Sequence, residues 1–256
     1  MLFSPLAFEI PHESWRWRVS VLAGYLLLGV LFTWPLVLHL SDSVIQKGDV
    51  PVDTAQGIWG LWWVRTALLS GANPYVTSML FYPESINMLY QTLSLPNVIP
   101  ALPGSLLAGP VVAFNSIILL SFILGGYWVY RLAYALTLDR FAALVAGFVF
   151  VCTPSQIQRL YGGSIELIAS FWLPFYFIVL IRALARRSLM GVFCAALTLF
   201  VTTLASQYYG LYAAVYTALY AVLATLHAPR ETRWTTFLTG AGVGLLWVAL
   251  LAPLLL

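Results

Sequence analysis

The chain has 256 residues, of which 61% are apolar and only 8% are charged. A soluble domain carries about 25% charged residues, and a soluble protein of this length could not bury so much apolar surface, because its outside must be largely polar. The composition therefore excludes a soluble globular protein and indicates an integral membrane protein. Cys152 and Cys194 both fall in apolar segments, so we interpret them as small buried hydrophobic residues, not as a disulfide or a zinc site.

Apolar segments recur along the chain at lengths of roughly 20 residues, the length of a helix that crosses a bilayer core. Hydropathy and helix-breaking residues predict seven of them. In chain order they are 17–40, 114–136, 140–153, 165–184, 189–205, 208–226 and 235–256. We therefore expect an all-α fold, a polytopic bundle of about seven transmembrane helices that makes residues 1–256 a single membrane domain.

The segment 95–113 is ambiguous, because its four prolines interrupt any regular helix. Cytoplasmic flanks of membrane spans carry the excess of Lys and Arg. If this segment does not cross, and the N-terminus is cytoplasmic, nine basic residues face the cytoplasm and three face outward. If it crossed, the bias would reverse. We therefore expect residues 1–16 in the cytoplasm, residues 41–113 in an outer loop, and the remaining spans within 114–256.

The outer loop 41–113 holds four of the nine acidic residues of the chain. Two of them, Asp49 and Asp53, lie in the turn-rich stretch 47–56 just outside the first span. Residues 54–70 predict a helix rich in tryptophan, and tryptophans beside a span favour the membrane–water interface. We expect two interfacial helices, over 54–70 and 95–113, joined by a connector that lies close to the bilayer.

The order of these features carries a resemblance. One span precedes an outer loop in which an acidic residue opens an interfacial helix, and a second interfacial segment and a span ending in a basic residue follow. The motifs, in chain order, are Asp53-x5-Trp59-x2-Trp62-Trp63, Leu80-Phe81-Tyr82-Pro83, Trp172-Leu173-Pro174-Phe175 followed by Arg182, and Ser206-Gln207-Tyr208-Tyr209-Gly210. Over nearly its whole length the chain resembles a bacterial branch of the GT-C superfamily of membrane glycosyltransferases, which includes protein mannosyltransferases and lipid A aminoarabinose transferases.

The resemblance implies an enzyme that moves a sugar from a polyprenyl-phosphate donor to an acceptor hydroxyl at the outer membrane face, inverting the anomeric centre. An acidic residue in the first outer loop is the expected catalytic base. The matching position is Asp53, and Asp49 is the fallback. The residue type suits this role, because a carboxylate can take the proton that the acceptor hydroxyl loses as it attacks.

The leaving group is an anionic lipid phosphate, so a cation is needed to stabilise it. Arg159 is the first candidate for this contact, and Lys47 and Arg65 follow. A divalent cation, Mg²⁺ or Mn²⁺, could also bind carboxylates together with phosphate oxygens, but no spacing in the sequence requires one. The expected partners are the polyprenyl-phosphate-linked sugar and membrane lipids, with no nucleic acid; the acceptor stays open.

The same residues have simpler interpretations. Asp53 and Gln56 have the spacing of a capping box, with Asp53 at the N-cap, and capping and catalysis are compatible. Asp49 follows Gly48, which is typical of a turn. Lys47 and Arg65 suit contacts with lipid headgroups, and Arg159 suits a headgroup as well as a substrate phosphate.

Glu166 has two interpretations as well. Relatives in the superfamily often place a second acidic residue in the second outer loop, where it helps to bind the acceptor or a metal. Alternatively, Glu166 is a carboxylate at a helix N-terminus, stabilised by the helix dipole. In the closer bacterial branch the position two residues earlier is a histidine, whereas this chain has Ser164, a departure that weighs against metal binding.

A lipid or solute permease is the competing class of function, and a non-catalytic GT-C relative is a third. A permease predicts ionisable residues deep within its spans, whereas the charges here cluster at the ends of the predicted spans. The resemblance further implies additional spans after residue 256. We therefore expect the N-terminal module of a longer enzyme of the bacterial cell envelope, in the inner membrane, with its active site outside.

Overall fold

The computed structural model describes residues 8, 10–46, 52–91 and 93–255. The described residues are mostly helical and include only one pair of two-residue strands, which confirms the all-α class. The helices are α1 (Trp15–Phe32), α2 (Val52–Leu69), α3 (Leu95–Ala108), α4 (Pro110–Thr137), α5 (Arg140–Val151), α6 (Pro154–Gly162), α7 (Ile165–Ile168), α8 (Trp172–Arg186), α9 (Leu189–Ala205), α10 (Gln207–His227) and α11 (Arg230–Leu255). Two 3₁₀ turns, Leu36–Leu38 and Met88–Gln91, and an antiparallel pair of two-residue strands, β1 (Val76–Thr77) and β2 (Ile86–Asn87), complete the elements.

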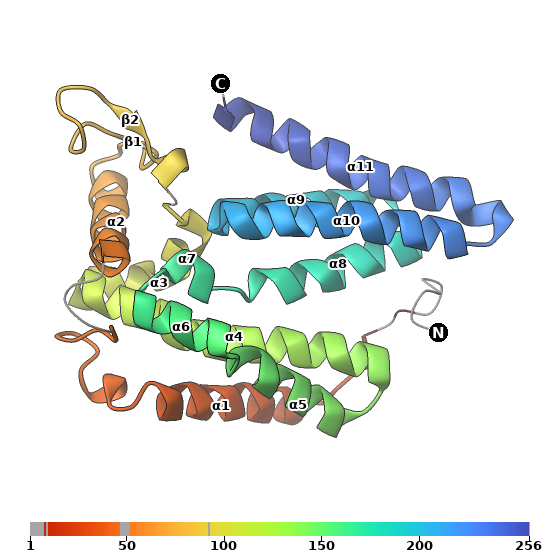
Figure 1. The fold of residues 1–256 in the computed structure, drawn as a ribbon, viewed down its shortest axis with the longest axis horizontal. Coiled ribbons are helices and arrows are strands. Elements are labelled where there is room, and N and C mark those ends of the chain that lie inside the picture. The colour runs from red at the N-terminus through yellow and green to blue at the C-terminus, as the bar shows by residue number, and fades with distance from the viewer. Residues whose placement is uncertain (1–7, 9, 47–51, 92, 256) are drawn as a thin grey trace.

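The long helices lie side by side in a bundle, and α2 lies across one end of it (Figure 1). Among the described residues, five helical segments are long and apolar enough to cross a membrane: α1, α4, Arg140–Gly162, α10 and α11. Helices α8 and α9 run along the same bundle but have 15 and 17 residues, which places them below that length. A membrane-embedded helical bundle is therefore supported, whereas the expected count of seven spans is not confirmed.

The third predicted span is longer than expected. Helix α5 ends at Val151, and α6 begins three residues later at Pro154, so together they give an apolar segment of 23 residues. Pro154 is tolerated because the first turn of a helix needs no amide donor there, and the Thr153 side chain accepts a 3.3 Å hydrogen bond from the backbone amide of Gln156. The expected outer connector around 153–165 is therefore mostly helical.

The prediction that the prolines of segment 95–113 interrupt any regular helix is wrong, because α3 is continuous over Leu95–Ala108. Pro100 and Pro103 lie inside it, and Pro96 occupies its first turn, where a proline costs no hydrogen bond. One face, which includes Asn97, Val98 and others, is buried against α2, α4 and α9. Packing on three neighbours therefore keeps the helix continuous where the prolines remove backbone donors.

Two hydrophobic clusters hold the bundle together. The first joins α1 to α7 around fully buried side chains such as Phe114 and Ile118 of α4. The second joins α8 to α11 around Tyr176 and Leu199.

Figure 1 shows α2, α6, α7 and the β1–β2 pair at one end of the bundle, and the start of α1 with the α4–α5 and α10–α11 turns at the other. We call the end of the bundle that carries α2 the α2 end. We call the opposite end the arginine end, because five arginines lie near it: Arg16, Arg18, Arg140, Arg230 and Arg233.

Candidate active site at the α2 end

A cavity of about 630 Å³ lies beside the first turns of α2. The 3₁₀ turn Met88–Gln91, the start of α3 and the short helix α7 form its other walls. Four polar residues line it, together with the aromatic side chains of Trp59 and Phe81. Those four are Asp53, Gln56, Gln91 and Glu166. The cavity therefore brings together two acids that are 113 positions apart in the sequence and that both belong to the predicted site.

Asp53 lies in the first turn of α2, which begins at Val52. The predicted capping box is therefore wrong: the helix starts before Asp53, and the Gln56 amide nitrogen donates to the Gln91 carbonyl and side-chain oxygens at 3.4 Å. The Asp53 side chain is exposed, and its Oδ2 accepts a 2.7 Å hydrogen bond from Ser164 Oγ. Its negative charge near a helix N-terminus is also favourable.

A glycine lets α2 approach closely enough for that bond. Gly163 ends α6 with φ of +75°, a left-handed conformation that favours glycine. A Cβ atom there would lie 2.9 Å from Thr54 Cβ and 3.0 Å from Thr54 Cα, and would overlap Thr54 Oγ1. Position 163 therefore requires glycine for two reasons, its left-handed backbone and its lack of space for a side chain. It directly precedes Ser164, which binds Asp53.

Glu166 lies in α7, is half-buried, and lines the same cavity. Burial raises the pKa of Glu166 above the usual range of a glutamate, and the nearby negative charge of Asp53 raises it further. Glu166 therefore holds its proton to a higher pH than an exposed glutamate does.

Arg159 lies close to the cavity but is not among the residues that line it. Its Nη1 donates a 2.7 Å hydrogen bond to the hydroxyl of Tyr209, at the start of α10. That hydroxyl in turn donates to the backbone carbonyl of Leu167 in α7. Gln156 Nε2 donates to the carbonyl of Ile168 at 2.6 Å. Side chains from α6 and α10 thus fix the short helix that carries Glu166.

The other predicted phosphate ligands are not brought together with Asp53. Arg65 lies twelve residues further along α2, a rise of about 18 Å, and it does not line the cavity. Lys47 and Asp49 fall outside the described residues. Within the described ranges, no three His, Cys, Asp or Glu side chains are grouped as a metal site would need.

Polar contacts hold the segment 89–97, which leads into α3 beside the cavity, against α8, α9 and α10. Ser94 Oγ donates to the carbonyl of Ala205 at 2.5 Å, and Asn97 Nδ2 donates to Ser94 Oγ at 2.7 Å. Trp172 Nε1 donates to Asn97 Oδ1 at 2.7 Å. Gln207 Nε2 donates to the Leu89 carbonyl at 2.5 Å. Sequence reasoning missed Ser94 and Asn97; the signal was two polar residues amid an apolar, proline-rich segment.

Comparisons with models of protein families, with curated proteins and with solved structures found no match to this chain.

Proposed function

We propose that this protein is an inverting glycosyltransferase of the GT-C kind, which takes a sugar from a polyprenyl-phosphate donor at the outer membrane face. The observation that carries the proposal is the pairing of Asp53 and Glu166 in one cavity beside an interfacial helix. A carboxyl group of raised pKa that shares one pocket with a second carboxyl group is a typical arrangement for proton transfer. The aromatic side chains of Trp59 and Phe81 offer apolar faces on which a sugar ring can pack.

In the proposed reaction Asp53 is the general base. The acceptor hydroxyl oxygen forms a bond to the anomeric carbon and gives its proton to the Asp53 carboxylate. The bond between the anomeric carbon and the donor phosphate oxygen breaks, and its electron pair leaves with the polyprenyl phosphate. Because the hydroxyl attacks from the face opposite the leaving phosphate, the anomeric configuration inverts. The Ser164 hydrogen bond holds one carboxylate oxygen in place, which leaves the other to face the acceptor.

Glu166 and Arg159 have supporting roles in the proposal. Glu166, with its raised pKa, binds a hydroxyl group of the sugar or acceptor. The Arg159 guanidinium is bound to Tyr209, whose hydroxyl also contacts α7, and a movement from Tyr209 toward the cavity would bring it to the leaving phosphate. A divalent cation, Mg²⁺ or Mn²⁺, could be held by Asp53, Glu166 and the donor phosphate together.

The proposed location is the bacterial inner membrane, with the α2 end outside. The support is the gathering of arginines at the opposite end of the bundle, as expected for a cytoplasmic surface. The polyprenyl-phosphate-linked sugar and membrane lipids are the proposed partners.

The decisive experiment is a transfer assay with the protein encoded by the complete reading frame, reconstituted in lipid with a polyprenyl-phosphate sugar donor. We expect Asp53→Asn to reduce the rate below a tenth of wild type, since the amide cannot accept the proton. Asp42→Asn is the matched control, because Asp42 is an exposed acid of the same loop whose carboxylate contacts His39 instead. An unchanged rate in Asp53→Asn would remove it as the base. A permease would instead move its solute across the membrane without any sugar transfer.

A further inference from the structure

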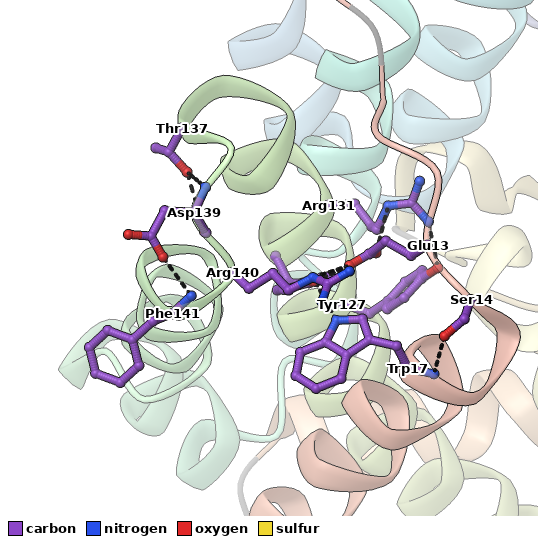
Figure 2. Close-up of polar contacts among 10 residues, drawn as sticks. Glu13, Ser14, Trp17, Tyr127, Arg131, Thr137, Asp139, Arg140 and Phe141 are labelled. Carbon is purple, nitrogen blue, oxygen red and sulfur yellow. Dashed lines mark hydrogen bonds and ion pairs between the residues drawn. The ribbon is translucent and has the colours of Figure 1, made fainter.

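A second polar cluster lies at the arginine end, opposite the cavity. Glu13, which precedes α1, is 2% exposed. Its carboxylate accepts a hydrogen bond from the Tyr130 hydroxyl and lies 3.9 Å from Arg131 Nε and 3.6 Å from Arg140 Nε (Figure 2). Two guanidinium groups thus share one carboxylate, so the cluster keeps a positive charge.

Arg140 is the member of this cluster that faces outward. Its side chain is half exposed, whereas that of Arg131 is 9% exposed. The Arg140 guanidinium lies over the ring of Trp17, 5.1 Å from its centroid, and 5.8 Å from the ring of Tyr134. Figure 2 shows the neighbouring Asp139 directed away from it, and Asp139 Oδ1 accepts from the amides of Phe141 and Ala142. Arg140 is therefore held in a fixed orientation with part of its charge available.

An apolar groove of about 280 Å³ begins at that same tryptophan. It follows the seam between α1 and α5, and its lining includes Trp17, Gly24 and Leu28 of α1 and Leu144 and Phe148 of α5. The Tyr25 hydroxyl donates to the carbonyl of Leu144 at 3.0 Å and closes the bottom of the seam. Around the groove, α5 exposes large apolar side chains, which is the surface expected against lipid tails.

The dimensions of this groove match one leaflet of a bilayer. From Trp17 to Leu28 the helix rises about 16 Å, and half of a bilayer hydrocarbon core is about 15 Å. Trp17 lies at the start of α1, at the level where tryptophans meet headgroups. A single acyl chain that enters beside Trp17 would therefore reach the bilayer midplane near Leu28.

We propose that the α1–α5 groove and Arg140 form a binding site for one anionic phospholipid, with an acyl chain in the groove and the phosphodiester on the Arg140 guanidinium. Charge complementarity selects this occupant: the groove takes a hydrocarbon chain, and its mouth presents a fixed planar cation with donors suited to phosphate. A zwitterionic phospholipid would bring its own cation to the same place. The site lies at the opposite end of the bundle from Asp53 and does not depend on the proposed reaction.

The site can be tested by lipid titration of the purified protein in detergent, with bound lipid counted by native mass spectrometry. The probes are phosphatidylglycerol and phosphatidylcholine with identical chains. We expect one tightly held phosphatidylglycerol and at least a tenfold preference over phosphatidylcholine. Arg140→Gln should abolish that preference, and Arg140→Lys should keep part of it. Arg233→Gln, which removes an exposed arginine from the same end, should leave it unchanged.

A second variant tests the groove without touching the charge. A Cβ atom on Gly24 would meet nothing within 4 Å, so Gly24→Leu fills the groove with little disturbance of the fold. We expect this variant to reduce binding of phosphatidylglycerol about tenfold, and soluble glycerol 3-phosphate not to compete with the lipid in the wild type. Equal losses in Arg140→Gln and Arg233→Gln, or full binding by Gly24→Leu, would overturn the proposal. The Gly24→Leu result decides the question even if Arg140→Gln fails to fold.

Discussion

Ser164 donates a 2.7 Å hydrogen bond to Asp53 across 111 positions of sequence. The bond joins the first turn of α2 to the connection between α6 and α7. Since Glu166 follows two residues after Ser164, one short segment both orients the candidate base and supplies the second carboxyl group of the cavity. The chemistry of the site therefore depends on how α2 docks on this connection.

Removing the Ser164 hydroxyl should misplace the base. Hydrogen bonds to charged groups contribute about 1.5–3 kcal/mol, so we expect Ser164→Ala to lower the sugar-transfer kcat about tenfold or more while the donor KM stays nearly constant. Ser164→Thr should restore part of the rate, because it keeps a hydroxyl. Ser116→Ala is the control, since the Ser116 hydroxyl donates within its own helix. A wild-type kcat in Ser164→Ala would contradict the positioning role.

Gly163→Ala should destabilise the fold by more than backbone strain alone. Gly71 provides the comparison, because it has φ of +71° and a Cβ atom there would meet nothing within 4 Å, whereas Gly163 has φ of +75° and close contacts with Thr54. A left-handed conformation costs about 1–2 kcal/mol for an ordinary residue. We expect Gly71→Ala to lower the thermal midpoint in detergent by the shift that this strain produces, and Gly163→Ala to lower it by clearly more. Equal shifts in the two variants would show that α2 does not depend on the close approach.

Glu166 should give the protein a pH-dependent stability. Burial, and then the charge of Asp53, raise the pKa of Glu166, so the folded protein keeps this proton where the unfolded chain has released it. The contribution of Glu166 to the free energy of unfolding therefore falls as the pH rises from about 4.3, the pKa of an unfolded glutamate, through the higher pKa in the fold. Above that second pKa it is constant.

Thermal midpoints measured in detergent between pH 4 and pH 8 test this dependence. Glu166→Gln should reduce the decrease of the thermal midpoint with rising pH. Asp53→Asn should move that decrease to lower pH, because it removes the neighbouring charge. Glu84→Gln, at an exposed glutamate of the outer loop, should leave the profile as in wild type. A Glu166→Gln profile that matched wild type would show that the group has no raised pKa.

The KM for the donor should show which of two arginines, Arg159 or Arg65, binds the donor phosphate. Arg159→Gln removes the guanidinium that Tyr209 holds, and we expect the KM for the polyprenyl-phosphate sugar to rise about tenfold. Tyr209→Phe should raise it less, because the guanidinium stays but loses its hydrogen-bond partner. Arg65→Gln should leave the donor KM unchanged, since Arg65 lies away from the cavity. The reverse ranking in a transfer assay would move the phosphate site to Arg65.

Cysteine labelling should decide whether α8 and α9 cross the membrane. If both cross, Ser188 in the turn between them lies on the opposite side of the membrane from Ser85; if neither does, the two serines lie on the same side. In a background with Cys152 and Cys194 replaced by alanine, we expect an impermeant maleimide to label Ser85→Cys in intact cells and to label Ser188→Cys only after permeabilisation. Labelling of both in intact cells would support five spans.

Composition and the spacing of apolar segments were sufficient to predict a helical membrane bundle, because a bilayer core requires apolar side chains and helices of about 20 residues. Helix limits near prolines were harder. Pro154 separates α5 from α6 without ending the apolar segment, and Pro100 and Pro103 lie within α3. In each case tertiary packing or the next helix supplies what the proline removes, and a single segment of sequence does not contain that information.

Two of the predicted site residues line the cavity, but their arrangement was not predicted. Asp53 and Glu166 were both chosen, yet their shared cavity depends on the close approach at Gly163, which arises only when α2 meets α6. Ser164 was noted for the histidine it replaces, not for the bond it makes. The Tyr209 motif was recognised without its role, because its partner Arg159 comes from a helix 50 positions earlier.

The separation between Ser164 and Asp53 also sets a minimum delay, during synthesis of the chain, before the contact between them can form. Ribosomes add about 5–20 residues per second, so roughly 6–22 s pass between the synthesis of Asp53 and that of the serine 111 positions later. During most of that interval α2 has been synthesised, whereas the connection between α6 and α7 on which it docks has not. Until then the first turn of α2 lacks the hydroxyl that binds Asp53, so this contact forms only after α6 and the residues up to Ser164 have been made.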